Sequence, residues 1–416
     1  MVINAQPPYR RRLVDPLLEE LFTQLSALMV TGPRAAGKTT STVRRAASAV
    51  RLDREAEAIA FAGDPDAALR ELPEPVLLDE WQAVPGVLGA VKRAVDADPR
   101  PGRFLLTGSV RAELENAVWP GTGRLVRVAM YPMTVREQLG RIGRPTFFDR
   151  LADGRDLTVP ADPPDLRGYV ELALRSGFPD PALRLTGQPR QAWLESYVED
   201  LLTHDVEAAE EGRRDPRRLR RYFEAYALGS AGVTDHKTIY DAAEVNKATA
   251  VAYESLLESL LVAEAVPAWR SNRLKRLVHQ PKRYLIDPAL IAAALRIDTR
   301  GTMRDGEVLG RVLDTFVAAQ LRPEITVSAA RPRLHHLRTE QGRHEIDLIA
   351  ELAGGPLIGI EVKAGAAPSA SDAKHLSWLR AELGERFAAG VVLHTGPRLY
   401  ELGERIVAAP ICTLWG

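Results

Sequence analysis

The sequence predicts an α/β protein of three modules, with a parallel-sheet domain at 1–150, a helical middle region at 151–300 and a second α/β domain at 301–416. A chain of 416 residues exceeds the roughly 250 residues at which a single hydrophobic core stops growing. The first module alternates short apolar runs with helical periodicity, as βαβ units do. Helical periodicity dominates the middle, and apolar strand patterns return near the C-terminus.

Composition indicates a globular protein that stays out of the membrane. The chain is 45% hydrophobic and 26% charged, and no apolar run approaches the roughly 18 residues that a membrane span needs. The basic N-terminus lacks the apolar stretch of a secretory signal, and Cys412 is the sole cysteine, which excludes an internal disulfide and a cysteine zinc site. We therefore expect a cytoplasmic protein that makes no contact with membranes.

Charge is balanced overall but uneven along the chain. Fifty-five basic residues match fifty-five acidic ones, so any binding of nucleic acid must depend on a local patch. Arginine is dense at 213–221, and further basic residues cluster at 270–283. Such runs form either solvated helix faces or phosphate-contacting patches, and both interpretations remain open here.

A glycine-rich loop lies between a predicted strand at 28–31 and a predicted helix at 41–50. It reads GPRAAGKTT and fits the phosphate-binding pattern G-x-x-x-x-G-K-[ST], in which backbone N–H groups surround phosphate oxygens. Glycines permit the close approach, the lysine reaches the β- and γ-phosphates, and the following hydroxyl holds Mg²⁺. We therefore predict that ATP and Mg²⁺ bind at Gly32, Pro33, Arg34, Ala35, Ala36, Gly37, Lys38, Thr39 and Thr40.

Two further strand ends supply polar groups for the same site. The apolar run at 76–78 ends in Asp79, expected to orient Mg²⁺, and Glu80, expected to polarise the attacking water. The run at 104–106 leads to Thr107 and Ser109, whose hydroxyls are candidates for sensing the γ-phosphate. Together with Lys38, these residues predict an ATP hydrolase.

Arg124 is a candidate arginine finger. A planar guanidinium suits the charge that spreads over phosphoryl oxygens, and Arg124 follows a glycine directly before a predicted strand at 125–130. An ordinary surface arginine fits the pattern equally well. A finger acting in trans would need a neighbouring subunit, so a homo-oligomer is an open alternative.

These motifs in this order resemble a family of prokaryotic AAA+ ATPases that carry a C-terminal domain of unknown function of the DUF4143 type. The resemblance rests on GPRAAGKTT, LLDEWQAVPGVLGAVKRAVD, FLLTGSVR, GTGR and YPMTVREQL, and continues through GFPDPAL, WLESYVEDLLTHDV, PKRYLIDPAL, EIDLIAEL and IEVKAG. It implies a P-loop ATPase domain, a winged-helix middle region and a restriction-endonuclease-like C-terminal core. This chain departs from the family at Ala35 and Ala36, at Arg175 and Ser176, where the family has a glycine pair, and at His204.

The middle region has the pattern of a winged helix-turn-helix. Helical pieces at 217–228, 235–243 and 246–260 precede two short strands at 261–269 and 283–286. In such a module the third helix enters a major groove and the wing contacts phosphates. DNA is therefore the expected partner, although winged helices also serve as protein-contact modules. The predicted DNA contacts are Asn246, Lys247, Thr249, Arg273 and Arg276.

The C-terminal domain carries a constellation of carboxylates. In the strand at 357–362, alternation places Glu361 and Lys363 on one face, and Asp347 lies on the neighbouring strand. Two carboxylates can hold a divalent cation while a lysine orients water. The nuclease resemblance adds Asp314 from a helix that begins at Gly310. A charged strand edge without catalytic use explains the same residues.

The sequence as a whole favours a Mg²⁺-dependent ATPase that acts on DNA or is regulated by it. An ATP-gated, metal-dependent nuclease is one alternative. A scaffold whose protein contacts ATP switches, with no nucleic-acid activity, is another.

Overall fold

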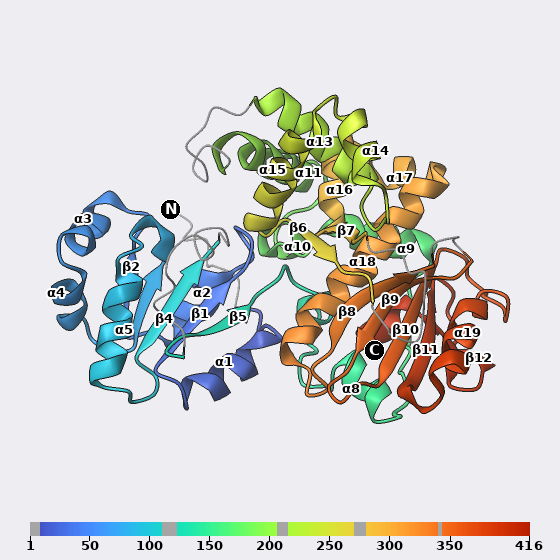
Figure 1. Ribbon diagram of the computed structural model, residues 1–416, viewed down its shortest axis with the longest axis horizontal. Helices are drawn as coiled ribbons and strands as arrows, with labels where there is room; N and C mark the ends of the chain where they lie inside the picture. The colour runs from blue at the N-terminus through green and yellow to red at the C-terminus, as the bar shows by residue number, and fades with distance from the viewer. Residues whose placement is uncertain (1–8, 110–122, 206–214, 270–279, 340–342) are drawn as a thin grey trace.

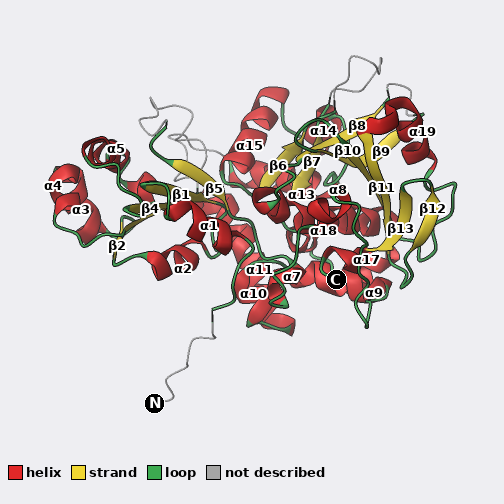
Figure 2. Cartoon of the chain, turned by 90° about the horizontal axis from the view of Figure 1, so that it is seen from below, coloured by secondary structure: helices red, strands yellow, loops and turns green. Residues whose placement is uncertain are grey.

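The computed structural model describes residues 9–109, 123–205, 215–269, 280–339 and 343–416 (Figure 1). A blue N-terminal sheet domain lies on one side, the helical middle region lies above, and a second sheet closes the other side. The helix α18 runs between these parts (Figures 1 and 2). The fold is α/β with two separate large sheets, as predicted. No helix within the described ranges is long and apolar enough to cross a membrane.

The N-terminal sheet has five parallel strands in the order β2-β3-β4-β1-β5. Strand alternation gives it two apolar faces. Met29, Leu78 and Leu106 face the helices α3, α4 and α5, whereas Val30 and Leu77 face α1. The strands are β1 (Ala27–Thr31), β2 (Ser48–Arg51), β3 (Val76–Asp79), β4 (Phe104–Gly108) and β5 (Val126–Ala129). The helices are α1 (Val14–Phe22), α2 (Lys38–Thr42), α3 (Glu55–Gly63), α4 (Pro65–Arg70) and α5 (Val87–Ala97).

The helix expected at 41–50 is shorter and begins earlier. It is α2, followed by one 3₁₀ turn at Val43–Arg45, after which Ser48–Arg51 forms the edge strand β2. Backbone pairing of Val50 with Leu78 on β3 outweighs the helix propensity of the alanines around it. The prediction was wrong here because local propensity cannot register a strand partner about 28 residues further along the chain.

The segment that follows β5 leaves the sheet domain and packs on α18 (Gly306–Val327). Its helices are α7 (Val135–Gln138) and α8 (Phe147–Ala152). Arg136 Nη1 lies 2.8 Å from Glu324 Oε1 in a fully buried ion pair, and the Phe147 N–H donates to Glu324 Oε2 at 2.6 Å. The segment from α7 to α8 therefore packs on α18, while Glu137 of α7 also accepts from Arg12 of the N-terminal segment.

The middle region places a helical bundle ahead of a small antiparallel hairpin. The hairpin pairs Ala263 with Leu285 and Val266 with Lys282. Among the elements of this region, α13, α14, α15 and the hairpin lie where the sequence predicted three helices and a two-stranded wing. The elements of the region are α9 (Leu166–Arg175), α10 (Pro179–Leu183), α11 (Gly187–Asp200), a π-helical turn (Leu201–Asp205), α13 (Pro216–Leu228), α14 (His236–Ala242), α15 (Lys247–Ser259), β6 (Ala263–Val266), β7 (Lys282–Leu285), α16 (Pro288–Leu295) and α17 (Thr299–Arg304).

The C-terminal sheet is mixed and has six strands in the order β12-β13-β11-β10-β9-β8. β10 pairs in parallel with β11 and antiparallel with β9. The helix α18 packs on one face of the sheet and α19 (Lys374–Leu383) on the other. The strands are β8 (Arg333–Arg338), β9 (Glu345–Glu351), β10 (Leu357–Lys363), β11 (Phe387–His394), β12 (Tyr400–Gly403) and β13 (Ile406–Pro410).

One hydrophobic core joins the middle region to the C-terminal sheet. Tyr222 and Leu257 of the helical bundle belong to the same buried cluster as Phe316 of α18 and Ile360 of β10. The chain beyond β6 also pairs with the sheet edge, since the Trp269 N–H donates to the His336 carbonyl at 2.7 Å. Trp269 is buried in the core under α19. The hairpin β6–β7 is therefore attached to the C-terminal sheet.

Candidate functional site

The glycine-rich loop connects β1 to α2 at the carboxyl end of the parallel sheet. A Cβ at Gly32 would lie 2.0 Å from the carbonyl oxygen of Met130, so this position admits no side chain. Gly37 has φ +94°, in the left-handed region that glycine tolerates best, and Ala35 also has a positive φ of +59°. Arg34 and Thr40 face solvent. The loop has the backbone geometry that the phosphate-binding motif requires.

Thr39 and Asp79 converge beside the loop. Thr39 Oγ1 donates to Asp79 Oδ1 at 2.8 Å, and Thr107 Oγ1 donates to the same oxygen. A hydroxyl and a carboxylate at this separation supply the hard oxygen ligands that Mg²⁺ prefers. These residues therefore fit a magnesium ion next to bound phosphates.

Glu80 follows β3 in a left-handed conformation, with φ +54°, which turns its side chain away from the strand direction. Its backbone N–H donates to Thr107 Oγ1 at 3.3 Å, and Ser109 Oγ donates to Glu80 Oε2 at 3.0 Å. Gln82 Nε2 donates to the same carboxylate oxygen. Thr107 and Ser109, predicted as phosphate sensors, thus orient the two carboxylates. Gln82 is a further contact that sequence analysis did not identify.

Lys38 is 4% exposed, and its ammonium donates to the Pro33 carbonyl at 2.9 Å within the loop. Burial lowers the pKa of Lys38, while Glu80 and Asp79 act in the opposite direction. The lysine is thus held inside the loop, on the side that faces the two carboxylates.

Arg12, which sequence analysis missed, binds both the loop and the segment that follows β5. Its Nη1 donates to the Ala36 carbonyl at 2.7 Å, its Nη2 to the Tyr131 carbonyl at 2.6 Å, and its Nε to Glu137 Oε1 at 2.9 Å. Only 3% of Arg12 is exposed. The basic run RRR near the N-terminus was the available signal, but nothing in it separates this buried arginine from its exposed neighbours.

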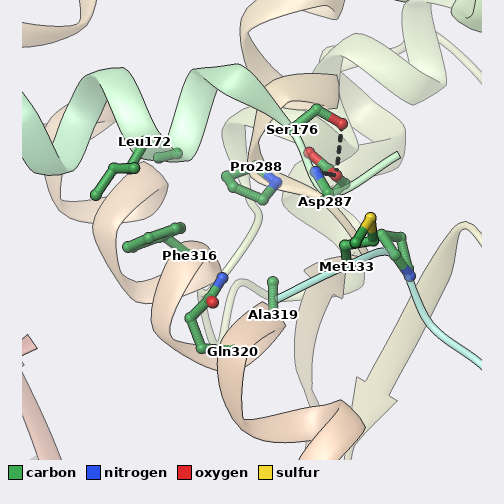
Figure 3. A pocket seen from close by; sticks show the side chains of 11 residues that line it. Met133, Leu172, Ser176, Asp287, Pro288, Phe316, Ala319 and Gln320 are labelled. Atoms are coloured by element: carbon green, nitrogen blue, oxygen red, sulfur yellow. Dashed lines mark hydrogen bonds between the residues drawn. The ribbon is translucent and has the colours of Figure 1, made fainter. Parts of the chain in front are cut away.

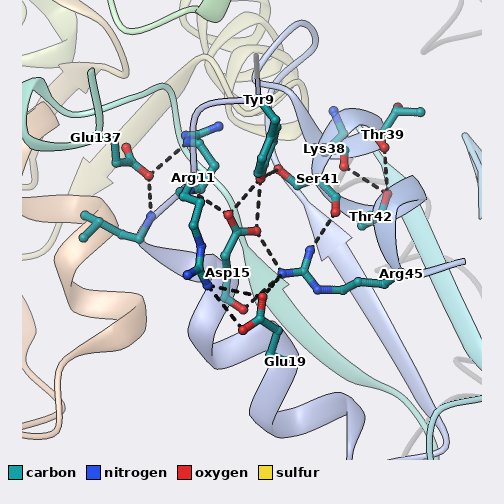
Figure 4. Close-up of polar contacts among 12 residues, drawn as sticks. Tyr9, Arg11, Asp15, Glu19, Lys38, Thr39, Ser41, Thr42, Arg45 and Glu137 are labelled. Atoms are coloured by element: carbon teal, nitrogen blue, oxygen red, sulfur yellow. Dashed lines mark hydrogen bonds and ion pairs between the residues drawn. The ribbon is translucent and has the colours of Figure 1, made fainter. Parts of the chain in front are cut away.

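A second network joins the N-terminal segment to α2 (Figure 4). The Tyr9 hydroxyl lies 2.8 Å from both Asp15 Oδ2 and Ser41 Oγ, and Arg45 Nη2 donates to Asp15 Oδ1 at 3.1 Å. Burial raises the pKa of Tyr9 to about 12, so this hydroxyl stays protonated at neutral pH. The N-terminal segment therefore holds the helix that follows the loop.

The helical middle region also reaches the loop. The Tyr197 hydroxyl of α11 donates to the Arg34 carbonyl at 3.4 Å. A Cβ at Gly37 would lie 3.4 Å from Pro179 Cγ, which begins α10. A cavity of about 40 Å³ separates Gly32 and Pro33 from Glu264 of the hairpin. The loop is therefore in contact with elements that lie far beyond the sheet domain.

Arg124 lies at the opposite end of the sheet. It precedes β5, whose first residue Val126 pairs with Leu28, whereas the loop follows Thr31 at the carboxyl end. Arg124 Nε donates to Asp96 Oδ1 at 2.8 Å near the end of α5. Arg124 therefore does not approach the loop of its own chain, and a role as a finger would require another subunit.

Comparison with known families agrees with this geometry. A family model described as AAA domain matches residues 24–139, and a model described as domain of unknown function DUF4143 matches residues 309–414. The N-terminal part of the chain is thus similar to AAA domains, and its C-terminal part is similar to DUF4143 domains. The AAA match covers the loop, both carboxylates and all five parallel strands, and nucleotide binding is what such a domain indicates.

The region between them also matches a family model. Residues 166–301 match a domain of unknown function, DUF8612, which covers α9 to α16 and the first turn of α17. Two relatives, uncharacterized proteins of Mycobacterium bovis and Mycobacterium tuberculosis, are each 28% identical over 406 residues, covering 96% of this chain and 83% of their own length. The similarity therefore extends across the AAA, middle and DUF4143 regions together.

The DUF4143 domain brings the predicted carboxylates together, with a lysine between them. Lys282 Nζ, from β7, lies 2.5 Å from Asp314 Oδ2 and 3.0 Å from Asp347 Oδ1. Lys363 Nζ lies 3.3 Å from Glu361 Oε2. No group of three or more His, Cys, Asp or Glu side chains in the described parts of the chain is arranged to hold a metal ion. The position expected for a second cation thus contains an ammonium group.

The basic residues of the middle region are partly neutralised. Arg220 and Arg221 form ion pairs with Glu199 and Glu244, and Arg218 Nε lies 3.5 Å from Asp215 Oδ2. Asn246 caps α15 by accepting from the Thr249 N–H at 2.9 Å, and Lys247 is exposed in the first turn of that helix. The other two predicted DNA contacts, Arg273 and Arg276, lie outside the described residues.

A buried aspartate joins two motifs that the sequence places far apart (Figure 3). Asp287 accepts hydrogen bonds from Ser176 Oγ at 2.8 Å, from the Gly177 N–H at 2.7 Å and from the Ala289 N–H at 2.9 Å. Ser176 has φ +75°, which explains why glycine is suited to this position. The cavity beside these residues measures about 10 Å³, which is the scale of a packing gap.

Proposed function

We propose that this chain binds ATP with Mg²⁺ at the loop between Gly32 and Thr39 and hydrolyses it. The observation that carries the proposal is the convergence of Thr39, Asp79 and Glu80 beside the loop, with Thr39 Oγ1 and Asp79 Oδ1 2.8 Å apart. Phosphoryl transfer depends mainly on positioning and on charge stabilisation, and these residues supply both.

Each residue has a distinct role in this proposal. Backbone N–H groups of the loop and Lys38 bind the β- and γ-phosphates, while Thr39 and Asp79 hold Mg²⁺, which neutralises charge on the phosphates. Glu80 orients the attacking water, and Ser109 with Gln82 fixes the direction of its carboxylate. Arg12 keeps the Ala36 carbonyl in place and acts as a positioning residue.

Steady-state hydrolysis and equilibrium binding of a fluorescent ATP analogue test the proposal. We expect Lys38→Ala to reduce turnover at least about 100-fold, because one buried positive charge on the phosphates is lost. Lys92→Ala is the matched control, since Lys92 is exposed and pairs with Asp96 on α5. Turnover by Lys38→Ala equal to that of the control would refute the assignment of the site.

We further propose that the ATPase acts on DNA or is regulated by it. Lys247 and Asn246 lie at the exposed first turn of α15, the third helix of the bundle that precedes the hairpin. The ion pairs of Arg218, Arg220 and Arg221 reduce the basic surface available to phosphates. We therefore expect weak binding that falls steeply with salt, as counterion release requires.

Fluorescence anisotropy with labelled single- and double-stranded DNA, at two salt concentrations and with or without ATP, measures this binding. ATPase turnover with the same DNAs shows whether the two activities are coupled. Lys247→Ala should weaken binding, whereas Lys92→Ala should not. Absence of binding at low salt under every nucleotide condition would favour the scaffold alternative, in which ATP orders protein contacts.

The role of Arg124 bears on the oligomeric state of the protein. Since Arg124 lies away from the loop of its own chain, a finger role predicts that Arg124→Ala lowers turnover while ATP affinity is retained. Sedimentation velocity with ATP and with ADP would then show a homo-oligomer. Unchanged turnover in Arg124→Ala would leave Arg124 as a surface residue paired with Asp96.

A further inference from the structure

The carboxylate cluster of the DUF4143 domain is assembled from three parts of the chain. Asp314 comes from α18, Asp347 from β9 and Glu361 from β10. Lys282 comes from β7, in the hairpin that belongs to the middle region. The cluster is therefore completed by a segment outside the DUF4143 match at residues 309–414.

Lys282 binds both aspartates at once and is closed off from water. Its side chain is 3% exposed, and its ammonium also lies 3.4 Å from the Asp347 carbonyl oxygen. The next residue on the same face of β7, Tyr284, donates its hydroxyl to Asp314 Oδ1 at 3.0 Å. Arg283, on the other face, pairs instead with Glu254 of α15. Because side chains alternate along a strand, Lys282 and Tyr284 of β7 both point toward the carboxylate cluster.

The side chain of Glu361 has one oxygen that accepts no hydrogen bond from the described residues. Its Oε1 is buried and has no hydrogen-bond partner in the described chain, while Oε2 faces Lys363. Burial, and next the charge of Asp347, raise the pKa of Glu361 well above its usual range. At neutral pH this raised pKa favours the protonated carboxyl, and a divalent cation that bound here would displace the proton and supply the partner that the buried oxygen lacks.

The charges in the cluster fit a cation that bridges two carboxylates. Burial by itself disfavours the ammonium of Lys282, yet Asp314 and Asp347 raise its pKa well above the usual value. Lys282 in turn lowers the pKa of Asp347 against the effect of burial. Two carboxylates in a buried site repel unless a positive charge lies between them, and a lysine supplies one such charge.

We propose that Lys282 is the resident cation of this cluster, and that it excludes divalent cations from Asp314, Asp347 and Glu361 for as long as β7 stays in place. The hairpin thereby keeps the DUF4143 domain in a metal-free form. The same contact makes any metal chemistry in this domain depend on withdrawal of β7. The inference does not depend on ATP hydrolysis.

Mn²⁺ binding in the absence of nucleotide tests the inference directly, with free Mn²⁺ measured by electron paramagnetic resonance. We expect Lys282→Met to gain about one Mn²⁺ site per chain, because the carboxylates lose their internal cation and oxygen ligands remain. Adding Asp347→Asn to Lys282→Met should abolish that site. Wild type and the exposed-lysine control Lys237→Met should show no binding that Asp347→Asn removes.

Two results would overturn the proposal. One is a wild-type Mn²⁺ site that Asp347→Asn removes, since the cluster would then accept metal beside Lys282. The other is a folded Lys282→Met variant that gains no site. If Lys282→Met does not fold, a resident cation predicts that Lys282→Met with Asp314→Asn folds, because one carboxylate charge is removed with the ammonium. Failure of both variants to fold would also refute the role.

Discussion

The nucleotide loop and the DUF4143 carboxylate cluster are two charged sites built in different ways. Most groups of the nucleotide site come from strand ends of one parallel sheet: Asp79 is the last residue of β3, and Glu80 follows it directly. The carboxylate cluster draws on a helix, two strands of a second sheet and a hairpin from another region. One site is local to a sheet edge, whereas the other exists through domain packing.

The difference has a physical origin. Parallel strands bring their carboxyl ends to one edge, so short motifs suffice to define what gathers there. In the cluster, Lys282 reaches Asp314 and Asp347 only because the hairpin is attached to β8 through Trp269 and His336. The first site should therefore respond to point changes in its motifs, and the second to changes at the junction.

The largest expected effect concerns Glu80 in the local site. Glu80→Gln should reduce ATP turnover about 1,000-fold, because the carboxylate that orients water becomes a neutral amide. ATP affinity should change only a few-fold, since Lys38 and the loop remain intact. Turnover and analogue binding are measured together, with the exposed Glu71→Gln as control. Retained turnover would place the catalytic carboxylate elsewhere.

The next effect concerns the junction and depends on pH. Burial, and next the nearby charge of Lys282, lower the pKa of His336 to about 4 despite its hydrogen bond with the Gln280 carbonyl at 2.8 Å. A lowered histidine pKa means that stability present above the unfolded pKa is lost as pH falls toward 4. Between pH 7 and pH 4.5 this residue alone should cost about 2 to 3 kcal/mol.

Urea unfolding of wild type and His336→Gln at both pH values isolates the contribution of His336 to the free energy of unfolding. Glutamine keeps a donor for the Gln280 carbonyl but does not titrate. The stability loss on acidification should be smaller in His336→Gln by that amount. Equal losses in both proteins would mean that His336 is not held neutral at the junction.

A smaller effect is expected at Arg12, where the local site depends on a distant residue. Arg12→Lys keeps a charge for Glu137 but cannot reach both the Ala36 and Tyr131 carbonyls. We expect the KM for ATP to rise about tenfold, consistent with loss of one or two hydrogen bonds to the charged group. Arg11→Lys is the matched control, since Arg11 is exposed and pairs with Glu19. Equal KM values in the two variants would mean that Arg12 contributes to folding and does not position the loop for ATP.

The smallest effect is expected at Ser176, in the packing between the middle region and α18. Ser176→Ala loses the hydrogen bond to Asp287 and keeps the positive φ, whereas Ser176→Gly loses the bond but relieves the backbone. Ser176→Gly should therefore be more stable than Ser176→Ala by about 1 kcal/mol in thermal unfolding. The reverse order would show that the hydroxyl, rather than the backbone, determines this position.

Sequence reasoning recovered much of the fold and part of the candidate site. The α/β class and the strands that carry Asp79, Thr107 and Asp347 followed from apolar periodicity, and the AAA and DUF4143 matches were expected from the family resemblance. It failed at 48–51, where pairing with β3 makes a strand, and it gave no indication of Arg12 or Gln82. Those features depend on contacts with residues distant in the sequence, which periodicity does not encode.

The sequence by itself determined the loop from Gly32 to Thr39 and its two companion carboxylates, because each lies next to the strand that positions it. Only the tertiary structure decided that Arg124 faces Asp96, that Thr107 and Ser109 orient carboxylates, and that Lys282 lies between Asp314 and Asp347. The physical reason is that charge pairing in a buried site depends on which segments meet, and packing of the hydrophobic cores determines that meeting.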